Sequence, residues 1–398
     1  MSYPVRSGVA AIVFAGVAGI GASAFNRTPT PLIVHEWGTI TTVHAAAGTP
    51  AGCLNRISGS DPLPDFVHRF EPAGLTVPPG SVVESPGTLK RVPLVKTPFG
   101  PCRPDVTMRL ETPVVYFHPA AGAEKNFPPF DVTVNFRGGV LNEFYPDAAA
   151  SVSADVEESD TRGHQLAVRS GFGQLAGQLW NGVLLDSSVV GKLRWSGVSL
   201  EESTPLPETA AHVWLAPRNV HAARVRTSAG EGEQYLFYRG VAHLDAVMQT
   251  RRSAAGVRLL APADLGWLRH PSAMIGAAWV IDVRANGSAA FRTVGPIGIN
   301  KSAASAELAN VPPFAEGDYT ATAIADLRAS MKRSLVAAGL FDDEAAAMLE
   351  TWSDSYFRSP GMRVFYLVPR EWTDYFLPLD ISIPTTLTRV LVGRIDLG

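Results

Sequence analysis

Side chains able to carry acid–base or metal chemistry fall into three groups, each within a segment that also has a strand pattern. The first is His35-Glu36, in the stretch LIVHEWGTITTV (residues 32–43). A histidine beside a carboxylate can transfer protons or ligate a divalent metal. Neighbouring side chains of a strand point to opposite faces, so both serve one site only if Gly38 introduces a bulge. A core or rim histidine without such a role is the alternative.

The second group is a pair of glutamates, Glu111 and Glu143. If Glu143 is partly buried, its carboxylate needs a charged partner, a metal or a proton. An arginine, Arg109 or Arg239, is the simplest partner. The alternative is a functional carboxylate pair that supplies acid–base groups or metal ligands.

The third group is Tyr238-Arg239, which could hold an anion or a sugar, or could be an ordinary strand end with a surface salt bridge. The candidate ligand-binding residues are therefore Trp37, Tyr145, Tyr238 and Arg239. Three more histidines could complete a metal site, although nothing in their spacing requires it: His68, His118 and His243. The cofactor stays open, with a divalent metal as a possibility.

No motif with a fixed catalytic geometry is present. The sequence has no G-x-S-x-G, no H-E-x-x-H and no Walker loop, and GFGQLAG (171–177) misses the dinucleotide fingerprint by one residue. The sequence therefore offers candidate residues without an established reaction.

The segment Val106–Pro146 has the clearest strand pattern. Apolar and polar residues alternate from Phe130 to Arg137, and Gly138-Gly139 favours a tight two-residue hairpin turn. In that register Glu143 lies on the apolar side of the sheet, whereas a one-residue bulge would place it in water.

Short strand patterns separated by turn residues continue from 165 to 300, and helical spacing is confined mainly to residues 319–357. The predicted fold is mainly β: two antiparallel β-sandwich-like modules with a helical hairpin near the C-terminus. The predicted divisions are a signal peptide (1–24), an N-terminal β module (25–148), a second β module (149–300), and a helical hairpin with strands that return to a sheet (301–398).

Residues 1–24 resemble a cleavable export signal: Arg6 is followed by an uncharged run and by Ala22-Ser23-Ala24. A membrane anchor is the alternative, and no later stretch is long and apolar enough to span a bilayer. In an exported, periplasmic or secreted protein, two cysteines most simply form one disulfide, Cys53–Cys102, and two free thiols or a metal pair are the alternatives. The net charge of −3 without a basic block makes nucleic acid an unfavourable partner.

Several motifs together resemble a family of exported bacterial proteins of unassigned function. They are HEWGT (35–39), RLETPVVYF (109–117), NEFYP (142–146), YLFYRG (235–240), VFYLVPR (364–370) and RVLVGRI (389–395). The family pattern is similar to H-E-W-G-T, M-E-T-P-V-x-Y-F and E-W-Y-P, with Leu110 and Phe144 here in place of Met and Trp. The resemblance implies export and brings no reaction, cofactor or substrate.

Two classes of function remain. The preferred one is a noncatalytic binding or surface-associated protein whose aromatic residues hold a carbohydrate, another small molecule or a protein. The alternative is an exported hydrolase or metal-dependent enzyme in which Glu111 and Glu143 act beside His35 and Glu36. Convergence of His35, Glu111, Glu143 and Arg239 in one cleft would favour the enzyme. Their scatter into separate salt bridges would remove the support for it. The sequence does not indicate the oligomeric state.

Overall fold

The computed structural model describes residues 31–54, 63–70, 82–84, 106–120, 127–154, 185 and 189–398. This part of the chain is mainly β, as predicted. The predicted signal peptide and Cys102 lie outside the described residues, so the signal and the Cys53–Cys102 disulfide stay predictions. Within the described ranges, no helix has the length and apolar character needed to cross a membrane.

The strands in chain order are β1 (Leu32–His44), β2 (His68–Arg69), β3 (Val82–Glu84), β4 (Met108–His118), β5 (Phe130–Arg137), β6 (Gly139–Tyr145), β7 (Ala149–Ala154), β8 (Val189–Leu200), β9 (Val225–Arg226), β10 (Gly232–Glu233), β11 (Leu236–Ala242), β12 (Gln249–Ser253), β13 (Gly256–Leu260), β14 (Ser272–Ile275), β15 (Ala278–Val283), β16 (Ala289–Val294), β17 (Ile297–Asn300), β18 (Glu307–Val311), β19 (Gly361–Leu367), β20 (Leu379–Ile381) and β21 (Thr385–Leu397).

The described α-helices are α3 (His212–Leu215), α4 (Ala323–Ala337), α5 (Asp342–Thr351) and α6 (Arg370–Phe376). Short 3₁₀ turns are η4 (Ala216–Asn219), η5 (Lys301–Ala303) and η6 (Glu316–Asp318), and η7 (Asp354–Arg358) is a π-helical turn.

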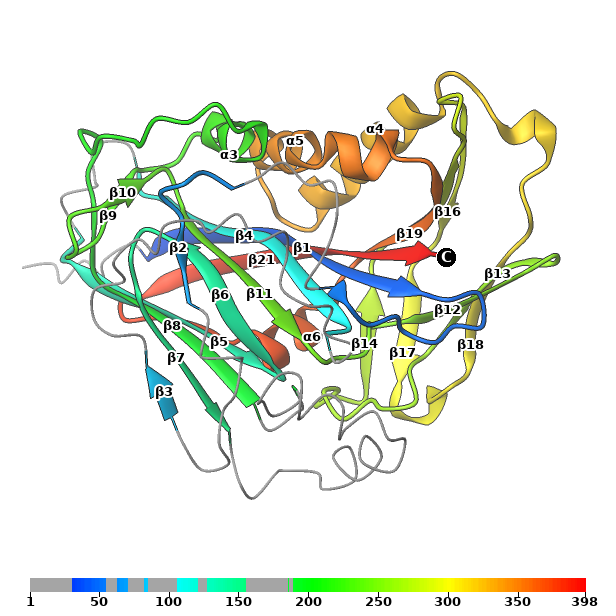
Figure 1. Ribbon diagram of the computed structural model, residues 1–398, viewed down its shortest axis with the longest axis horizontal. Helices are drawn as coiled ribbons and strands as arrows, with labels where there is room; N and C mark the ends of the chain where they lie inside the picture. The colour runs from blue at the N-terminus through cyan, green and yellow to red at the C-terminus, as the bar shows by residue number, and fades with distance from the viewer. Residues whose placement is uncertain are drawn as a thin grey trace, which may run out of the picture. The chain divides into compact units, whose positions relative to one another are not determined.

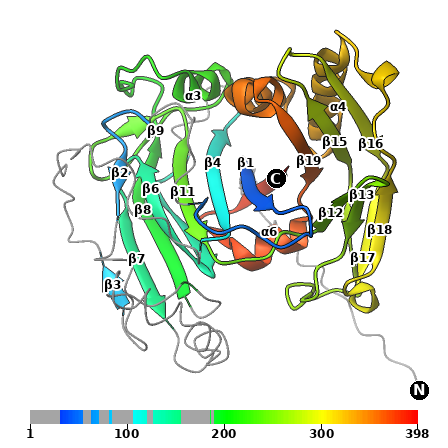
Figure 2. The same ribbon diagram turned by 45° about the vertical axis from the view of Figure 1, so that its right-hand side comes forward.

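A 16-stranded sheet is the main element of the described chain, and its longest path runs β10-β9-β8-β6-β11-β4-β1-β21-β19-β15-β16. Strand β1 lies inside this path, antiparallel to β4 and parallel to β21. In Figure 2, β6, β8 and β11 lie to the left and β15, β16 and β19 to the right, with β4 and β1 between them. The sheet crosses the predicted module boundary at 148/149, because β6 pairs with both β8 and β11.

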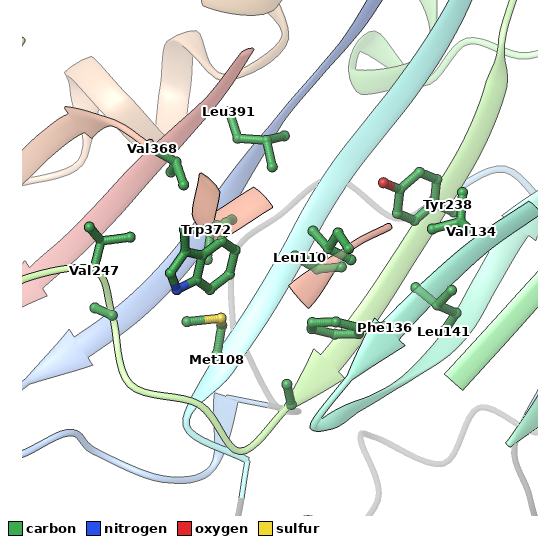
Figure 3. Close-up of a cluster of buried hydrophobic side chains, with 14 of the residues drawn as sticks. Met108, Leu110, Val134, Phe136, Leu141, Tyr238, Val247, Val368, Trp372 and Leu391 are labelled. Atoms are coloured by element: carbon green, nitrogen blue, oxygen red, sulfur yellow. The ribbon is translucent and has the colours of Figure 1, made fainter. Parts of the chain in front are cut away.

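Apolar side chains cover both faces of this sheet. The first core contains Leu110, Phe136, Tyr238 and Trp372, and Figure 3 shows Trp372 of α6 beside Met108 and other side chains of this cluster. A strand that is apolar on both faces is typical of a sheet covered on both sides.

The second core lies on the opposite face and contains Trp37, Tyr116, Met348 and Tyr356. Figure 1 shows α3, α5 and α4 along one side of the sheet and α6 on the other. Within the segment predicted to be helical, helical spacing predicts nine inward residues, of which Ile324 is only partly buried. The other eight are buried: Leu327, Met331, Leu335, Ala345, Met348, Leu349, Trp352 and Tyr356.

The predicted tight hairpin at Gly138-Gly139 is wrong, although both of its strands exist. Strand β5 pairs with β8 and β20, and β6 pairs with β11 and β2. Gly138 has a φ of +79°, which suits glycine. The turn joins two strands that pair with other strands and not with each other. Alternation along a strand fixes its two faces and not its neighbours.

Candidate metal centre

Strands β1 and β4 place two histidines on the same face of the sheet. His118 is opposite Ile33 and Tyr116 is opposite His35, so the two histidines occupy adjacent rows of the antiparallel pair. Their ring centroids lie 5.1 Å apart. His35 is buried and His118 is nearly so. The sheet thus holds two imidazoles side by side at the end where β1 begins.

Helix α5 supplies a carboxylate to the same place. Glu344 is the third residue of α5, and its Oε2 accepts a hydrogen bond of 2.7 Å from the main-chain N–H of Phe341, the residue before the helix. This cap satisfies a donor that the first helical turn leaves free and fixes the side chain beneath the helix. The Glu344 side chain is 0% exposed.

The three side chains meet through their ligand atoms. His35 Nδ1 lies 2.7 Å from Glu344 Oε2, and His118 Nε2 lies 3.0 Å from Glu344 Oε1. One ligand atom from each residue can be chosen so that all lie within 4.8 Å of one another. Two imidazole nitrogens and a carboxylate oxygen at this spacing can bind a divalent transition metal.

The main chain fixes the protonation of His118. Its Nδ1 lies 3.2 Å from the carbonyl oxygen of His221, which can only accept, so Nδ1 carries a proton. Its Nε2 then faces a carboxylate oxygen of Glu344. That contact is favourable only if Nε2 is also protonated or if a cation lies between the two atoms. Metal-bound histidines commonly donate their second nitrogen to a carbonyl in this way.

Glu344 is held as a carboxylate. Burial opposes its ionisation, but the hydrogen bonds to His118 and His35, and that from the main chain of Phe341, outweigh this cost and lower its pKa below the usual value. The ionised form is the one that binds metal, so the charge state of the group favours cation binding.

A second layer of contacts supports this group. Asp343 Oδ1 accepts from the main-chain N–H of Glu344 at 2.9 Å, and Oδ2 accepts from that of His221 at 2.8 Å. Since the His221 carbonyl orients His118, Asp343 connects the start of α5 to the loop that orients the second imidazole. The Phe341 ring lies 4.5 Å from the ring of His35 and 4.8 Å from that of His118, and it is 43% exposed.

Of the sequence-predicted residues, Glu36 lies on the opposite face from His35. Its Oε1 accepts from the Tyr238 hydroxyl at 2.5 Å and its Oε2 from Arg389 Nε at 2.5 Å. Burial, and next to it the charge of Glu36, raises the pKa of Tyr238 well above its usual value, so the phenol stays protonated and donates. Glu36 and Tyr238 therefore form a buried polar group within the first core and do not join His35.

The glutamate pair lies on the same face as His35 but farther along the sheet. Thr39, four residues after His35, is opposite Glu111. Glu143 is opposite Arg239 and lies 3.6 Å from its Nη1 and 3.4 Å from Arg69 Nε. The predicted arginine partner of Glu143 is thus found, and the residues of the predicted enzyme site divide into separate groups.

The aromatic residues proposed as a ligand surface are buried. Trp37 and Tyr145 belong to the second core and Tyr238 to the first. Their burial does not favour stacking on a ligand from solvent. His68 binds Glu231 at 2.8 Å, away from the metal centre, and His243 is not part of it.

Glu344 was missed by the sequence analysis. It follows Asp342-Asp343 at a predicted helix start, where acidic residues are common because they complement the helix dipole. It is 309 residues from His35 along the chain, and no spacing rule connects such distant positions. The one available signal was the suggestion that His118 could complete a metal site.

No family model matches the sequence, and neither a curated protein nor a solved structure is significantly similar to it.

Proposed function

We propose that this protein is an exported metal-binding protein that holds a divalent transition metal, with zinc the best fit, between His35, His118 and Glu344. The observation that carries the proposal is the convergence of two imidazoles and one carboxylate, from two strands and a helix, at a buried position. Zinc accepts nitrogen and carboxylate ligands together and has no geometric demand beyond a near-tetrahedral arrangement.

Metal binding also fits the contacts of His118 with the His221 carbonyl and Glu344. Without a cation, His118 must be doubly protonated to donate both to the His221 carbonyl and to Glu344. A divalent ion would replace the proton between His118 Nε2 and the carboxylate, and it would compensate the charge of Glu344 in the low-dielectric interior.

Metal-dependent hydrolysis is the second candidate. Within the described ranges, no fourth histidine, cysteine or acidic residue belongs to the group. A site with three protein ligands leaves one position on the metal for water or substrate, as catalytic zinc sites do. This supports a metal-dependent enzyme that uses His35, His118 and Glu344, a different set from the predicted one with Glu36, Glu111 and Glu143, whose residues lie in separate groups. A noncatalytic carbohydrate- or protein-binding role has less support, because it depended on aromatic residues that are buried.

We also propose that the sheet is sandwich-like around the first core, with α4 and α5 forming a helical hairpin over the second core. The two cores on opposite faces of the sheet, one of them covered by α6 and the other by α4 and α5, support a layered arrangement. Contact of Tyr356 with Phe365 of β19, at 4.6 Å between ring centroids, supports the packing of the helical region on the sheet.

Elemental analysis of the purified protein tests the metal proposal. We expect about one zinc per chain after incubation with zinc and dialysis, and a loss of most of it in Glu344→Gln and His118→Ala. His212→Ala is the matched control, because His212 is half exposed and contacts Glu350 instead. Wild-type protein that retains no metal, or Glu344→Gln that retains as much as wild type, would contradict the proposal.

A further inference from the structure

Arg239 is a buried guanidinium with unused hydrogen-bond donors. The residue is 4% exposed, and its Nε and Nη2 have no hydrogen-bond partner in the part of the chain that the structure describes. Its closest carboxylate contact is through the third nitrogen, Nη1, at 3.6 Å from Glu143. Buried charged groups are normally paired and hydrogen-bonded, so an arginine in this state indicates a missing partner.

The two unused donors form one edge of the guanidinium. Nε–H and Nη2–H point in the same direction and match the two oxygens of a carboxylate or phosphate. Other arginines of this protein use that edge in this way. Arg394 holds both oxygens of Asp396 at 2.9 and 2.8 Å, and Arg218 holds Glu233 through Nε and Nη2 at 2.9 and 2.6 Å.

The charges around Arg239 also leave a positive excess. Arg239 lies within the electrostatic influence of Arg109, Glu111 and Glu143, and Glu143 also contacts Arg69. Burial and then the charge of Arg109 lower the pKa of Arg239 to about 10, against the opposing effect of Glu143 and Glu111. The group is therefore still charged at neutral pH, and one positive charge among these five residues lacks a counter-charge.

A neutral donor lies beside this excess charge. Thr41 is opposite Arg109 in the pairing of β1 with β4, and its buried hydroxyl has no hydrogen-bond partner among the described residues. Arg109 is in turn opposite Val241 of β11, the strand that carries Arg239. Two positive side chains and a hydroxyl thus come from three adjacent strands.

We propose that Arg239, together with Arg109 and Thr41, binds an oxyanion group, a phosphate, sulfate or carboxylate. Arg239 supplies the two parallel donors, Arg109 supplies charge, and Thr41 supplies a further donor. The site is separate from the metal centre: on β1, Thr41 lies six residues from His35, roughly 20 Å along an extended strand. The inference therefore does not depend on metal binding.

Titration of the purified full-length protein with sodium phosphate, sulfate and acetate tests this site. Sodium chloride at matched ionic strength is the reference. We expect saturable binding by calorimetry and a rise in Tm that chloride does not give. Preference for phosphate or sulfate would identify a phosphoryl or sulfate group, and preference for acetate a carboxylate.

Arg239→Lys keeps the charge but removes the paired donors, so it should weaken binding at least about tenfold. Thr41→Val keeps the shape and should weaken binding as well, which keeps the test valid if Arg239→Lys folds poorly. Arg258→Lys is the control, because Arg258 is half exposed and pairs with Glu307. Binding should persist in Glu344→Gln, which separates this site from the metal centre.

Two outcomes would overturn the proposal. One is a wild-type protein that shows no oxyanion binding beyond the effect of chloride, which would mean that water or another part of the chain fills this edge. The other is a well-folded Arg239→Lys protein that binds as tightly as wild type.

Discussion

At the scale of single residues, the candidate metal centre has an outer contact, Asp343, whose carboxylate accepts from main-chain N–H groups beside the proposed ligand atoms. Asp343 accepts hydrogen bonds from the main chain at Glu344 and at His221, and thereby sets the distance between the carboxylate and the second imidazole. Groups in such an outer layer orient the metal ligands, and their loss usually weakens metal affinity.

Asp343→Asn should lower zinc affinity by about 10- to 100-fold without unfolding the protein, because an amide can accept only one of the two N–H groups. Competition with a chromophoric chelator measures the affinity. Asp342→Asn is the matched control: it removes the same charge from the same helix start, but its side chain is 80% exposed and pairs with Lys332. Equal zinc affinity in the two variants would show that Asp343 does not position the ligands.

His44 should make the protein less stable in weak acid. Burial lowers the pKa of His44 from 6.5 to about 4. Between these values the unfolded chain binds a proton that the folded chain does not, so the free energy of unfolding falls as the pH drops from 6.5 toward 4. The shift corresponds to about 3 kcal/mol at most.

Urea unfolding at several pH values measures this effect, and His44→Gln should show a smaller loss over the same interval. A glutamine can still bond to Thr250, the present partner of His44. The lowered pKa of Glu344 also reduces the free energy of unfolding in acid, but this contribution is the same in both proteins. Parallel pH profiles for the two proteins would rule out a contribution from His44.

At the scale of elements, the sequence predicted which residues form strands better than it predicted their partners. The alternation from Phe130 to Arg137 correctly identified β5 and its buried face. The adjacent glycines then suggested a hairpin, but β8, which begins 52 residues after Arg137, pairs with β5 instead. Long-range pairing depends on how distant strands pack together, which no local pattern encodes.

At Gly38, too, the sequence indicates a local feature but not the residue that it contacts. A glycine inside a strand pattern indicates a bulge or a close backbone approach, and the pairing of β1 with β4 does shift between Trp37 and Thr39. The irregular residue is on the neighbouring strand, where Thr112 has a φ of +47°. The sequence of β1 signalled the contact but could not identify Pro113 as the residue that approaches Gly38.

Gly38→Ala should destabilise the protein by about 1 to 3 kcal/mol, because the added Cβ would lie 2.7 Å from the Cα of Pro113, an atom that cannot move aside alone. Gly276→Ala is the control, since its Cβ would meet only Leu367 Cδ1 at 3.7 Å. Urea unfolding of both variants measures the difference. A Gly38→Ala protein as stable as Gly276→Ala would mean that the two strands separate easily at this point.

At the scale of the whole described chain, the first and last described strands, β1 and β21, lie side by side in the sheet. Strand β1 pairs with β21 in parallel along 13 residues, from Leu32 with Thr385 to His44 with Leu397. The apolar pattern of the final strands predicts that they return to an earlier sheet. No local pattern indicates that they lie beside the first described strand, because Leu32 and its partner Thr385 are 353 residues apart along the chain.

Removal of residues 384–398 should abolish cooperative folding, because it exposes one whole edge of β1 and removes Leu391 and Ile395 from the first core. Near-ultraviolet circular dichroism and urea unfolding measure the loss. A synthetic peptide of residues 384–398 should restore part of the signal. A truncated protein that still unfolds cooperatively would show that β21 is an accessory strand.

The parallel pairing of β1 with β21 also has a consequence for biosynthesis. A nascent chain that still lacks its last strand presents a bare β edge and an uncovered apolar face to every other nascent chain nearby. This exposure therefore lasts until β21 has been synthesised, however quickly the other strands assemble. A chain of this topology benefits from a chaperone that shields the edge of β1 until β21 is available.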